Sequence, residues 1–379
     1  MHPLRDLGLT DLRRRTSVKW QLHGPDVLPL WVAEMDARVA PPVRAALVRA
    51  IEEGDTGYPL LEPYAEAFAD FADDRWGWRP ARTTVVADVM SGAVEALRLV
   101  APPGAAVVIS PPVYPPFLGY VEAAGWSVRE APLDADGRLD PAALDTAFAG
   151  AAAYFLCSPQ NPTGVVHTAD ELREVARLAA RHGVRVVVDE VHAPLVRPGV
   201  TFTPYLSLPE AADAFAIASA SKAWHLAGMK AALLTAGPAA ADDLDRLHWV
   251  VEHGPSHLGV LAHTVALREG RAWLDAALAD LEDNRTLLVG LLAEHLPRVR
   301  MRVPDATYLA WLDCRALPPA VAEAPGAWFL EHAGVALVEG TDFGTGGSGH
   351  VRLNFATTPE ILTEAVRRMG AAVAGTTPA

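Results

Sequence analysis

The segment from residue 219 to residue 230, SASKAWHLAGMK, contains Lys222 and Lys230, two of only three lysines in a chain that has 29 arginines. Arginine does not deprotonate near neutral pH, whereas a lysine with a lowered pKa is a nucleophile that can form a Schiff base. Small hydroxyl residues before Lys222 and a second cation after it suit a cofactor that carries both an aldehyde and a phosphate. Pyridoxal 5'-phosphate (PLP) is such a cofactor. The alternative is that Lys222 is a solvated surface charge, but the neighbouring motifs favour the cofactor.

A carboxylate follows a buried apolar run at Asp189, in the sequence VVVDEVH of residues 186–192. In an open α/β sheet, ligands bind beyond the carboxyl ends of the strands. A carboxylate there can pair with the protonated pyridine nitrogen of PLP and keep the ring an electron sink. Asp189 could instead cap a strand-to-loop turn. The spacing of 33 residues from Asp189 to Lys222 allows one more crossover and strand between them, which favours the cofactor.

A phosphate-binding cup is predicted from residues that are far apart in the sequence. Residues 88–97, DVMSGAVEAL, indicate a loop that opens an amphipathic helix, whose first N–H groups and dipole attract an anion. Alone, this Ser-Gly-Ala is an ordinary helix start. Together with the SASK motif it predicts a cup formed by Ser91, Gly92, Ala93, Ser219, Ser221 and Lys230. The glycine-rich residues 344–349 lack the ending of a nucleotide P-loop and indicate a flexible loop.

Three further residues could contact the cofactor or its substrate. Asn161 lies in the tight turn CSPQNPTG and could donate to the phenolate oxygen of PLP. Tyr114, on the proline-rich loop PPVYPPF, could stack on the cofactor ring, or it could equally pack in the core. Arg352, in the predicted strand VRLNFA, could bind a carboxylate bidentately, or it could be a surface arginine paired with a nearby acid.

The pattern of apolar residues predicts an α/β fold that positions these side chains. Buried strands are expected at 105–109, 153–156 and 184–188, with a helix at 171–182 between the last two. Strand, helix, buried strand is typical of a parallel sheet with crossover helices. A long amphipathic helix is expected at 272–296. We therefore predict an arm at 1–40 that belongs to a small domain, a large domain at 41–275 and a small C-terminal domain at 276–379.

Composition excludes several classes of function. A net charge of −14 and an isoelectric point near 5.4 argue against nucleic acid or an anionic membrane as a partner. Two cysteines cannot form a disulfide framework and suit a reducing cytosol, and no apolar signal or membrane-spanning run is found. The thirteen histidines form no HExxH or Ser-His-Asp pattern, so a metal site or a serine hydrolase is not expected. We therefore expect a cytoplasmic protein whose partner is a small-molecule amino-acid substrate.

Taken in order, the motifs resemble the class I/II aminotransferase-like PLP enzymes of fold type I. The greatest resemblance is to the branch of cystathionine β-lyases and cysteine-S-conjugate β-lyases, also called the MalY/PatB family. It covers nearly the whole chain, from Lys19-Trp20 to the RLNFA sequence, and it implies a large, mostly parallel sheet domain covered by helices and a smaller α+β domain. The motifs that carry it together are Trp31-Val32-Ala33-Glu34-Met35-Asp36, Gly57-Tyr58, Tyr114, Asn161-Pro162-Thr163-Gly164, Asp189-Glu190-Val191-His192, Ser219–Lys222, Lys230 and Arg352-Leu353-Asn354-Phe355-Ala356.

The resemblance implies a role for each site residue. Lys222 is implied as the catalytic lysine that binds the PLP aldehyde, and Tyr58 is implied to reach the phosphate across a homodimer interface. His192 stands where many aminotransferases carry Tyr, as in the lyase branch, so which group supports the ring oxygen stays open. The implied cofactor-binding residues are Tyr58, Ser91, Gly92, Ala93, Tyr114, Asn161, Asp189, His192, Ser219, Ser221, Lys222 and Lys230, and the implied substrate-binding residues are Arg352, Tyr114 and Asn161.

Two positions depart from the family pattern. Glu34 stands where the lyase branch usually has Asp, and Lys230 stands where aminotransferases usually have Arg. A point charge in place of a planar fork should still bind phosphate, with less fixed geometry.

Three functions compete. The leading expectation is a carbon–sulfur β-lyase that cleaves cystathionine or a cysteine S-conjugate to thiol, pyruvate and ammonia. An L-amino-acid aminotransferase is the first alternative, because it uses the same lysine, aspartate, asparagine and arginine. A PLP-binding regulatory module is the second, which the retained reactive lysine and the lack of a preceding helix-turn-helix disfavour.

Overall fold

The structure, a computed structural model, describes residues 1–376. The chain forms two compact units: one contains residues 1–38, 161–164 and 273–379, and the other contains residues 39–160 and 165–272. They are called here the small unit and the large unit. The predicted domain boundaries at residues 40 and 275 stay a prediction.

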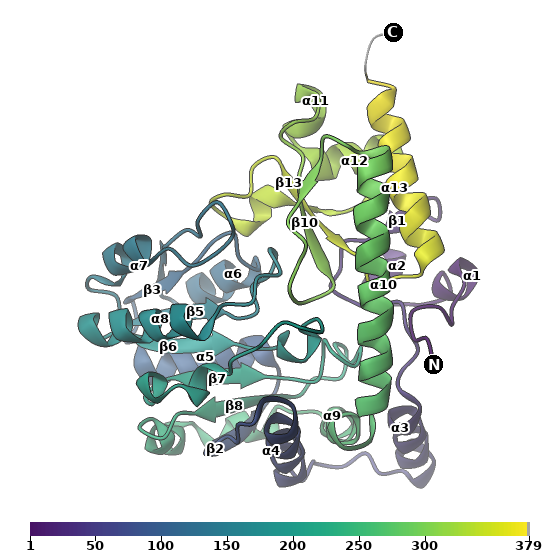
Figure 1. The fold of residues 1–379 in the computed structure, drawn as a ribbon. Helices are drawn as coiled ribbons and strands as arrows, with labels where there is room; N and C mark the ends of the chain where they lie inside the picture. The colour runs from purple at the N-terminus through teal and green to yellow at the C-terminus, as the bar shows by residue number, and fades with distance from the viewer. Residues whose placement is uncertain (377–379) are drawn as a thin grey trace. The chain divides into compact units, whose positions relative to one another are not determined.

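The large unit is built on a seven-stranded sheet in the order β2-β8-β7-β6-β5-β3-β4 (Figure 1). Strands β4, β3, β5, β6 and β7 run parallel, whereas β8 is antiparallel to both β7 and β2. This agrees with the predicted mostly parallel sheet. The strands are β2 (Arg82–Val86), β3 (Ala106–Ile109), β4 (Ser127–Glu130), β5 (Ala153–Cys157), β6 (Arg185–Asp189), β7 (Phe215–Ala218) and β8 (Ala232–Ala236).

Helices cover both faces of this sheet because its central strands are apolar on both sides. Phe155 of β5 packs in one core with α5 and α6, while its neighbours Tyr154 and Leu156 pack in the other core with α7 and α8. Successive strand residues therefore alternate between the two cores. The helices of the large unit are α3 (Pro41–Glu53), α4 (Glu62–Trp76), α5 (Val89–Val100), α6 (Pro116–Ala123), α7 (Pro141–Phe148), α8 (Ala169–His182) and α9 (His257–Glu269).

Helix α8 shows how local sequence sets an element's ends. Thr168 and Glu171 form a reciprocal capping box at its start, and Gly183 ends it in the left-handed conformation at φ 70°. The helix predicted at 171–182 is thus confirmed, two residues longer at its N-terminus. The strands predicted at 105–109, 153–156 and 184–188 correspond to β3, β5 and β6, each shifted by at most one residue at either end.

The small unit contains a four-stranded antiparallel sheet in the order β12-β13-β10-β9 and a short parallel pair, β1 with β11. The helix predicted at 272–296 is α10 (Arg271–His295). Asn284 is buried in α10 and donates to the carbonyls of Phe355 and Thr357. The remaining elements are α1 (Leu9–Leu12), α2 (Val18–Gln21), β1 (Leu28–Pro29), β9 (Arg300–Met301), β10 (Leu309–Asp313), α11 (Pro319–Ala322), α12 (Pro325–Ala333), β11 (Val335–Ala336), β12 (Val338–Glu339), β13 (His350–Asn354) and α13 (Pro359–Ala374).

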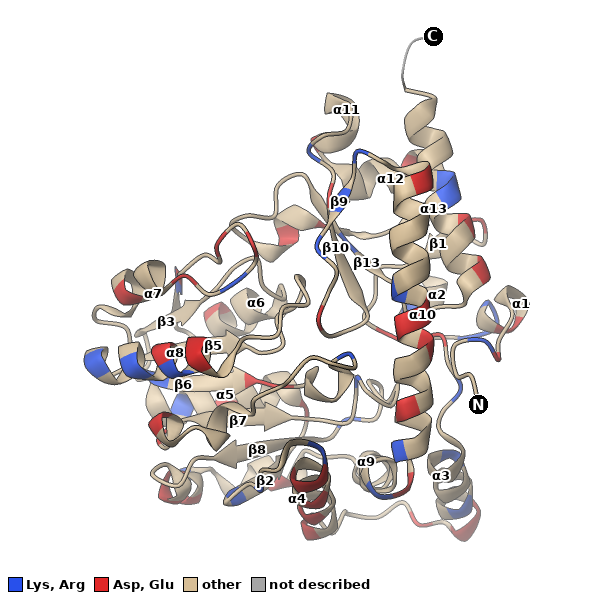
Figure 2. Cartoon of the chain, in the orientation of Figure 1, with Lys and Arg blue, Asp and Glu red and all other residues tan. Residues whose placement is uncertain are grey.

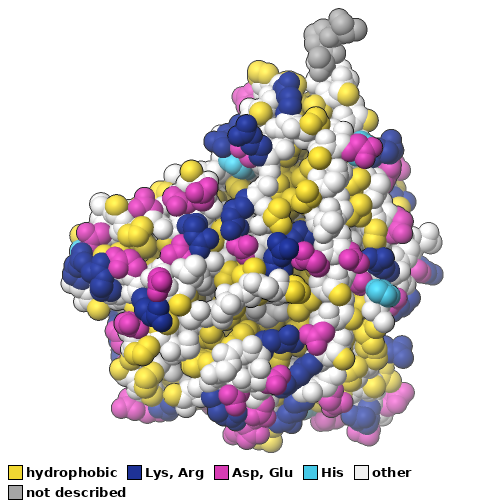
Figure 3. Space-filling view, in the orientation of Figure 1, with side chains coloured by type: hydrophobic (Ala, Val, Ile, Leu, Met, Phe, Trp, Pro, Cys, Tyr) yellow, Lys and Arg dark blue, Asp and Glu magenta, His cyan; other side chains and the backbone are white. Residues whose placement is uncertain are grey.

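Charged side chains of both signs are visible on the face of the molecule drawn in Figures 2 and 3. Acidic residues mark α4 most densely, while α8 carries both signs (Figure 2). On the face drawn in Figure 3, cationic and anionic side chains alternate. Within residues 1–376, no helix combines the length and the apolar character that crossing a membrane requires.

Candidate active site

The loops that follow the parallel strands of the large unit carry most of the predicted site residues. Asp189 is the last residue of β6, Tyr114 follows β3 and Lys222 follows β7. The carboxyl ends of parallel strands meet at one edge of a sheet, so these residues are brought to the same edge. Backbone bonds tie neighbouring loops together: Ser158 N donates to Asp189 O, and Glu190 N donates to Ile217 O.

Asp189 is a buried carboxylate, with 5% of its surface exposed. Its Oδ1 accepts a hydrogen bond of 2.9 Å from the Val191 amide. Burial raises the pKa of Asp189 to about 6, although the Val191 amide and the charge of Lys222 act in the opposite direction. A buried carboxylate that stays ionised is stabilised by a nearby positive charge. The protonated ring nitrogen of PLP would supply such a charge to Asp189.

The adjacent carboxyl, Glu190, is in a different state. Its Oε1 accepts a hydrogen bond of 2.7 Å from the Tyr205 amide. Burial, and secondarily the charge of Asp189, raises the pKa of Glu190 to about 8, so it is protonated at neutral pH. The DEVH sequence therefore holds one carboxylate and one neutral carboxylic acid side by side, which sequence reasoning did not separate.

The loop that carries Lys222 is held by its own backbone and by Trp224. The Ser219 hydroxyl donates to Ala231 O at 2.8 Å and accepts from Ser221 N at 3.1 Å. Trp224 is fully buried, and its indole N–H donates to Gly270 O at 2.9 Å. His225 adopts a left-handed conformation with φ 57°, which is uncommon for residues other than glycine, although histidine adopts it more often than most. The Ser219 hydroxyl proton is therefore already used in a hydrogen bond to Ala231 O, so Ser219 cannot donate it to a phosphate unless that bond breaks.

A buried pair behind this loop was missed by sequence reasoning. Tyr64 of α4 and His263 of α9 are fully buried, with the Tyr64 hydroxyl 3.1 Å from His263 Nδ1. Burial raises the pKa of the Tyr64 hydroxyl, so it is protonated at neutral pH. Burial lowers the pKa of His263 to about 4, so the imidazole is neutral. No sequence signal links residues 199 positions apart, because neither lies in a motif.

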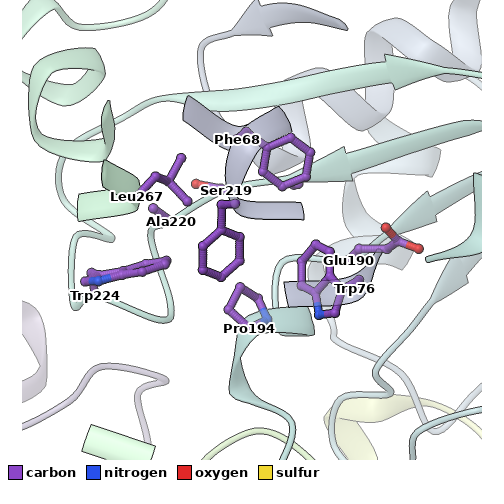
Figure 4. Close-up of a pocket in the computed structure, with 10 residues that line it drawn as sticks. Phe68, Trp76, Glu190, Pro194, Ser219, Ala220, Trp224 and Leu267 are labelled. Carbon is purple, nitrogen blue, oxygen red and sulfur yellow. The ribbon is translucent and has the colours of Figure 1, made fainter. Parts of the chain in front are cut away.

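A small cavity lies beside the same loop, and its walls are mainly apolar, with aromatic and aliphatic side chains (Figure 4). Glu190 and Ser219 are the polar residues that line it. Apolar walls deprive Glu190 of solvent, which is the physical cause of its raised pKa. The remaining lining residues are Phe68, Phe71, Trp76, Pro194, Ala218, Ala220, Trp224 and Leu267.

The predicted phosphate residues lie where α5 begins, with one difference from expectation. Ser91, Gly92 and Ala93 belong to the helix itself, and the loop ends at Asp88, which caps it. Asp88 Oδ1 accepts from Ser91 N at 2.8 Å, and Asp88 Oδ2 lies 3.1 Å from Lys230 Nζ. Burial raises the pKa of Asp88, but the Ser91 amide and Lys230 outweigh it, so the pKa is lowered overall. A carboxylate therefore already occupies the anion position at this helix end.

Gly92 packs α5 directly against β2. A Cβ at this position would lie 2.6 Å from Val86 Cγ2, closer than carbon atoms approach in proteins. A glycine is therefore required for the helix to start at this depth beside the sheet.

Three other predicted residues of the large unit differ in exposure. His192 is buried and precedes the short 3₁₀ helix Ala193–Leu195. Tyr58 is 89% exposed in the segment between α3 and α4, so the single chain does not bury it beside Lys222. Tyr114 is partly buried and contacts Phe117 edge-on, with ring centres 6.3 Å apart.

The small unit brings Arg352 and Asn161 together. Arg352 on β13 is only 5% exposed, which rules out the alternative of a surface arginine. Its Nη1 donates to Asn161 Oδ1 at 3.1 Å and its Nη2 to Trp31 O at 2.9 Å. The guanidinium also lies 5.1 Å from the centre of the Phe343 ring. These contacts hold the arginine fork in one orientation, as a carboxylate clamp requires.

Comparisons with known proteins agree with these observations. Residues 41–369 match the family model described as aminotransferase class I and II. The chain is 53% identical to a Mycobacterium leprae protein that bears the name "Putative cystathionine beta-lyase", with 98% of each chain covered. It is 35% identical to the cystathionine beta-lyase of Corynebacterium glutamicum, covering 95% of this chain and 98% of that one. A crystal structure of a Corynebacterium diphtheriae protein described as a "putative PLP-dependent beta-cystathionase" superposes with a TM-score of 0.93 at 35% identity, covering 99% of this chain and 100% of that chain.

Proposed function

Because the chain belongs to the aminotransferase class I and II family, we propose that it is a PLP-dependent carbon–sulfur β-lyase. It cleaves cystathionine or another cysteine S-conjugate to a thiol, pyruvate and ammonia. The observation that carries this choice of reaction is the similarity, over nearly the whole chain, to relatives named cystathionine beta-lyase.

The residues of the large unit fit PLP. The buried Asp189 carboxylate suits a cationic ring nitrogen, and the lysine needed to bind an aldehyde lies on the next loop at Lys222. When bound, PLP supplies an electron sink for the negative charge that develops at the substrate Cα. Asp189 would keep that sink effective by supplying the negative charge that pairs with the ring nitrogen.

Lys222 carries the proton transfer. Its amine would hold the aldehyde of PLP and, once released by the substrate amine, would act as general base for the Cα proton. The hydrogen bonds of Ser219 and of the buried Trp224 hold the loop that carries this amine. The neutral Glu190 adds no second negative charge beside Asp189 at pH 7.

The N-terminus of α5 and Lys230 bind the cofactor phosphate. Ser91, Gly92 and Ala93 supply the helix start, and Ser219 and Ser221 lie on the Lys222 loop. A phosphate bound here has to share the Ser91 amide and Lys230 with Asp88, or replace that carboxylate. Tyr114 would stack on the ring, and His192 and Asn161 lie in the segments that follow β6 and β5.

Arg352 binds the substrate carboxylate, with Asn161 and Tyr114 as the other substrate-binding residues. Asn161 Oδ1 and the Trp31 carbonyl each take one N–H of the guanidinium, which orients the remaining donors.

The active enzyme is a homodimer, in which Tyr58 reaches the phosphate of the partner subunit. Large apolar side chains are exposed along α3 and the segment after it: Val48 at 48%, Ile51 at 57%, Tyr58 at 89% and Leu60 at 67%. A group of exposed apolar side chains of this kind is typical of a protein interface. The two cysteines, Cys157 and Cys314, are both buried and free, which suits a cytoplasmic enzyme.

One experiment separates the lyase from an aminotransferase. Purified enzyme is given cystathionine or S-ethylcysteine without a keto acid, and pyruvate, ammonia and thiol are measured over many turnovers. Elimination needs no second substrate, so the lyase continues. An aminotransferase stops after one half-reaction and resumes only when a keto acid is added. Such a stall with every thioether, together with turnover of alanine or aromatic amino acids, would overturn the lyase assignment. Lys222→Ala is the inactive control.

A further inference from the structure

The third lysine of the chain, Lys19, is not explained by the cofactor. It belongs to the small unit, and its side chain is fully buried. Its Nζ lies 2.9 Å from Asp36 Oδ2, an ion pair whose angles fall outside those of a hydrogen bond, and it donates to Glu34 O at 2.9 Å. Asp36 is also fully buried, and its Oδ1 accepts from the Trp20 indole at 3.0 Å. Burying two charges carries a desolvation cost, so a buried ion pair that the cofactor does not explain suggests another role.

The Lys19–Asp36 ion pair lies at the end of a backbone segment in which successive carbonyls accept hydrogen bonds from side chains. In this carbonyl segment (residues 31–36), Trp31 O accepts from Arg352, and Val32 O and Glu34 O both accept from Asn354 Nδ2, at 2.6 and 2.8 Å. The Tyr308 hydroxyl donates to Ala33 O at 3.0 Å. Side chains rather than a sheet ladder therefore satisfy this stretch of backbone.

Lys19 and Arg352 hold opposite ends of the carbonyl segment. Lys19 and Asn354 share the Glu34 carbonyl, and Asn354 is two residues from Arg352 on β13, on the same face of the strand. The Asp36 amide in turn donates to Ala356 O at 2.8 Å. Because Asn354 binds both the Val32 and the Glu34 carbonyls, a shift of Glu34 would also move the adjacent Trp31 carbonyl. That carbonyl accepts one N–H of Arg352.

We propose that the buried Lys19–Asp36 ion pair is a positioning device for Arg352, which sets the enzyme's selectivity for a substrate with a free carboxylate. This inference rests on the proposed function, since it takes Arg352 as the group that binds the carboxylate. A lysine serves here because its compact ammonium can contact a carboxylate and a carbonyl at once, whereas the planar fork of arginine needs more room.

The test removes both charges together, with Lys19→Met and Asp36→Asn in one variant, so that neither charge is left buried alone. S-ethylcysteine is compared with its carboxamide, which lacks the negative charge. We expect the KM for the acid to rise and kcat to change little, so that the preference for the acid over the amide falls about tenfold. A general loss of stability would instead lower activity on both compounds equally, and that result would overturn the proposal.

A binding measurement gives a readout independent of turnover. 3-(Ethylthio)propionate keeps the carboxylate and the thioether but has no amine, so it cannot react with the cofactor. Calorimetry should show its dissociation constant weakened several-fold in the double variant. An unchanged constant would refute the inference. If the wild-type enzyme releases no thiol from any thioether, the proposed function fails, while this binding comparison still decides the role of Lys19.

The matched control is Asp280→Asn, the same chemical change at another buried carboxylate of the small unit. Asp280 is 1% exposed and pairs with His2 at 2.9 Å and with the Leu4 amide at 3.0 Å, and it makes no contact with the carbonyl segment among the described hydrogen bonds. It should lower the melting temperature and leave the acid-to-amide preference unchanged. Should the double variant not fold, Trp20→Phe keeps both charges and removes one bond to Asp36. It should shift the preference in the same direction by a smaller factor, and no shift would contradict the proposal.

Discussion

Replacing Asp189 by Asn should have opposite effects on the protein with and without its cofactor. Without PLP, the charged carboxylate is a burden, because burial raises its pKa from an ordinary value near 3.8 to about 6. Each tenfold change in proton affinity is worth about 1.4 kcal/mol, so the charge destabilises the cofactor-free protein by about 3 kcal/mol. The substitution keeps an oxygen that can accept from the Val191 amide.

The stability of the cofactor-free protein should depend on pH, because folding raises the pKa of Asp189. The unfolded chain loses the proton near pH 4 and the folded chain near pH 6, so stability falls as the pH rises between these values and then stays low. Asp189→Asn removes this loss. The cofactor-free variant should therefore melt several degrees higher than the wild type at pH 7 and match it near pH 4.

With PLP bound, the same substitution should be harmful. A neutral amide no longer favours the protonated ring nitrogen, and we expect kcat to fall at least a hundredfold, about 3 kcal/mol of barrier. Thermal melting of the cofactor-free and PLP-loaded proteins, with steady-state kinetics on one thioether, measures both effects. Glu190→Gln is the matched control. Burial raises the pKa of Glu190 to about 8, so this side chain is already neutral at pH 7. Its replacement should change neither the melting temperature nor kcat much. Near-normal turnover in Asp189→Asn would show that Asp189 is only a turn residue, and an unchanged melting temperature without PLP would refute the buried-charge argument.

Three further predictions concern other residues of the site. Borohydride reduction followed by peptide mass spectrometry should place the pyridoxyl group on Lys222, and its recovery on any other residue would contradict the assignment. Arg352→Ala should lower kcat/KM by about a hundredfold or more while the visible absorption of bound PLP stays intact, because only the carboxylate clamp is lost; loss of the absorption band would mean that Arg352 supports the cofactor instead. Light scattering should report a dimer, and Tyr58→Phe should weaken PLP binding in it; a stable monomer with full activity would remove Tyr58 from the site.

The sequence by itself determined the elements and the residue types of the site, because both are local properties. Runs of apolar residues predict β5 and β6, the amphipathic pattern of residues 171–182 predicts all but the first two residues of α8, and Asp189 is placed at a strand end by the sequence that precedes it. A lysine among 29 arginines marks the position where an amine is needed. The family could be recognised for the same reason, since its motifs are short and follow one another in order.

The tertiary structure alone decided how these residues are held and charged, because contacts between distant segments leave no local pattern. Asp189 and Glu190 are adjacent carboxylic acids, yet burial against an apolar cavity raises the pKa of Glu190 so far that it is neutral at pH 7, while Asp189 is charged. Asp88 is the cap of α5 and reaches Lys230, 142 residues away. The buried partner of Lys19 is likewise set by the path of the chain rather than by its composition. Burial depends on what the rest of the fold places around a side chain, and that is what sets its pKa and its geometry.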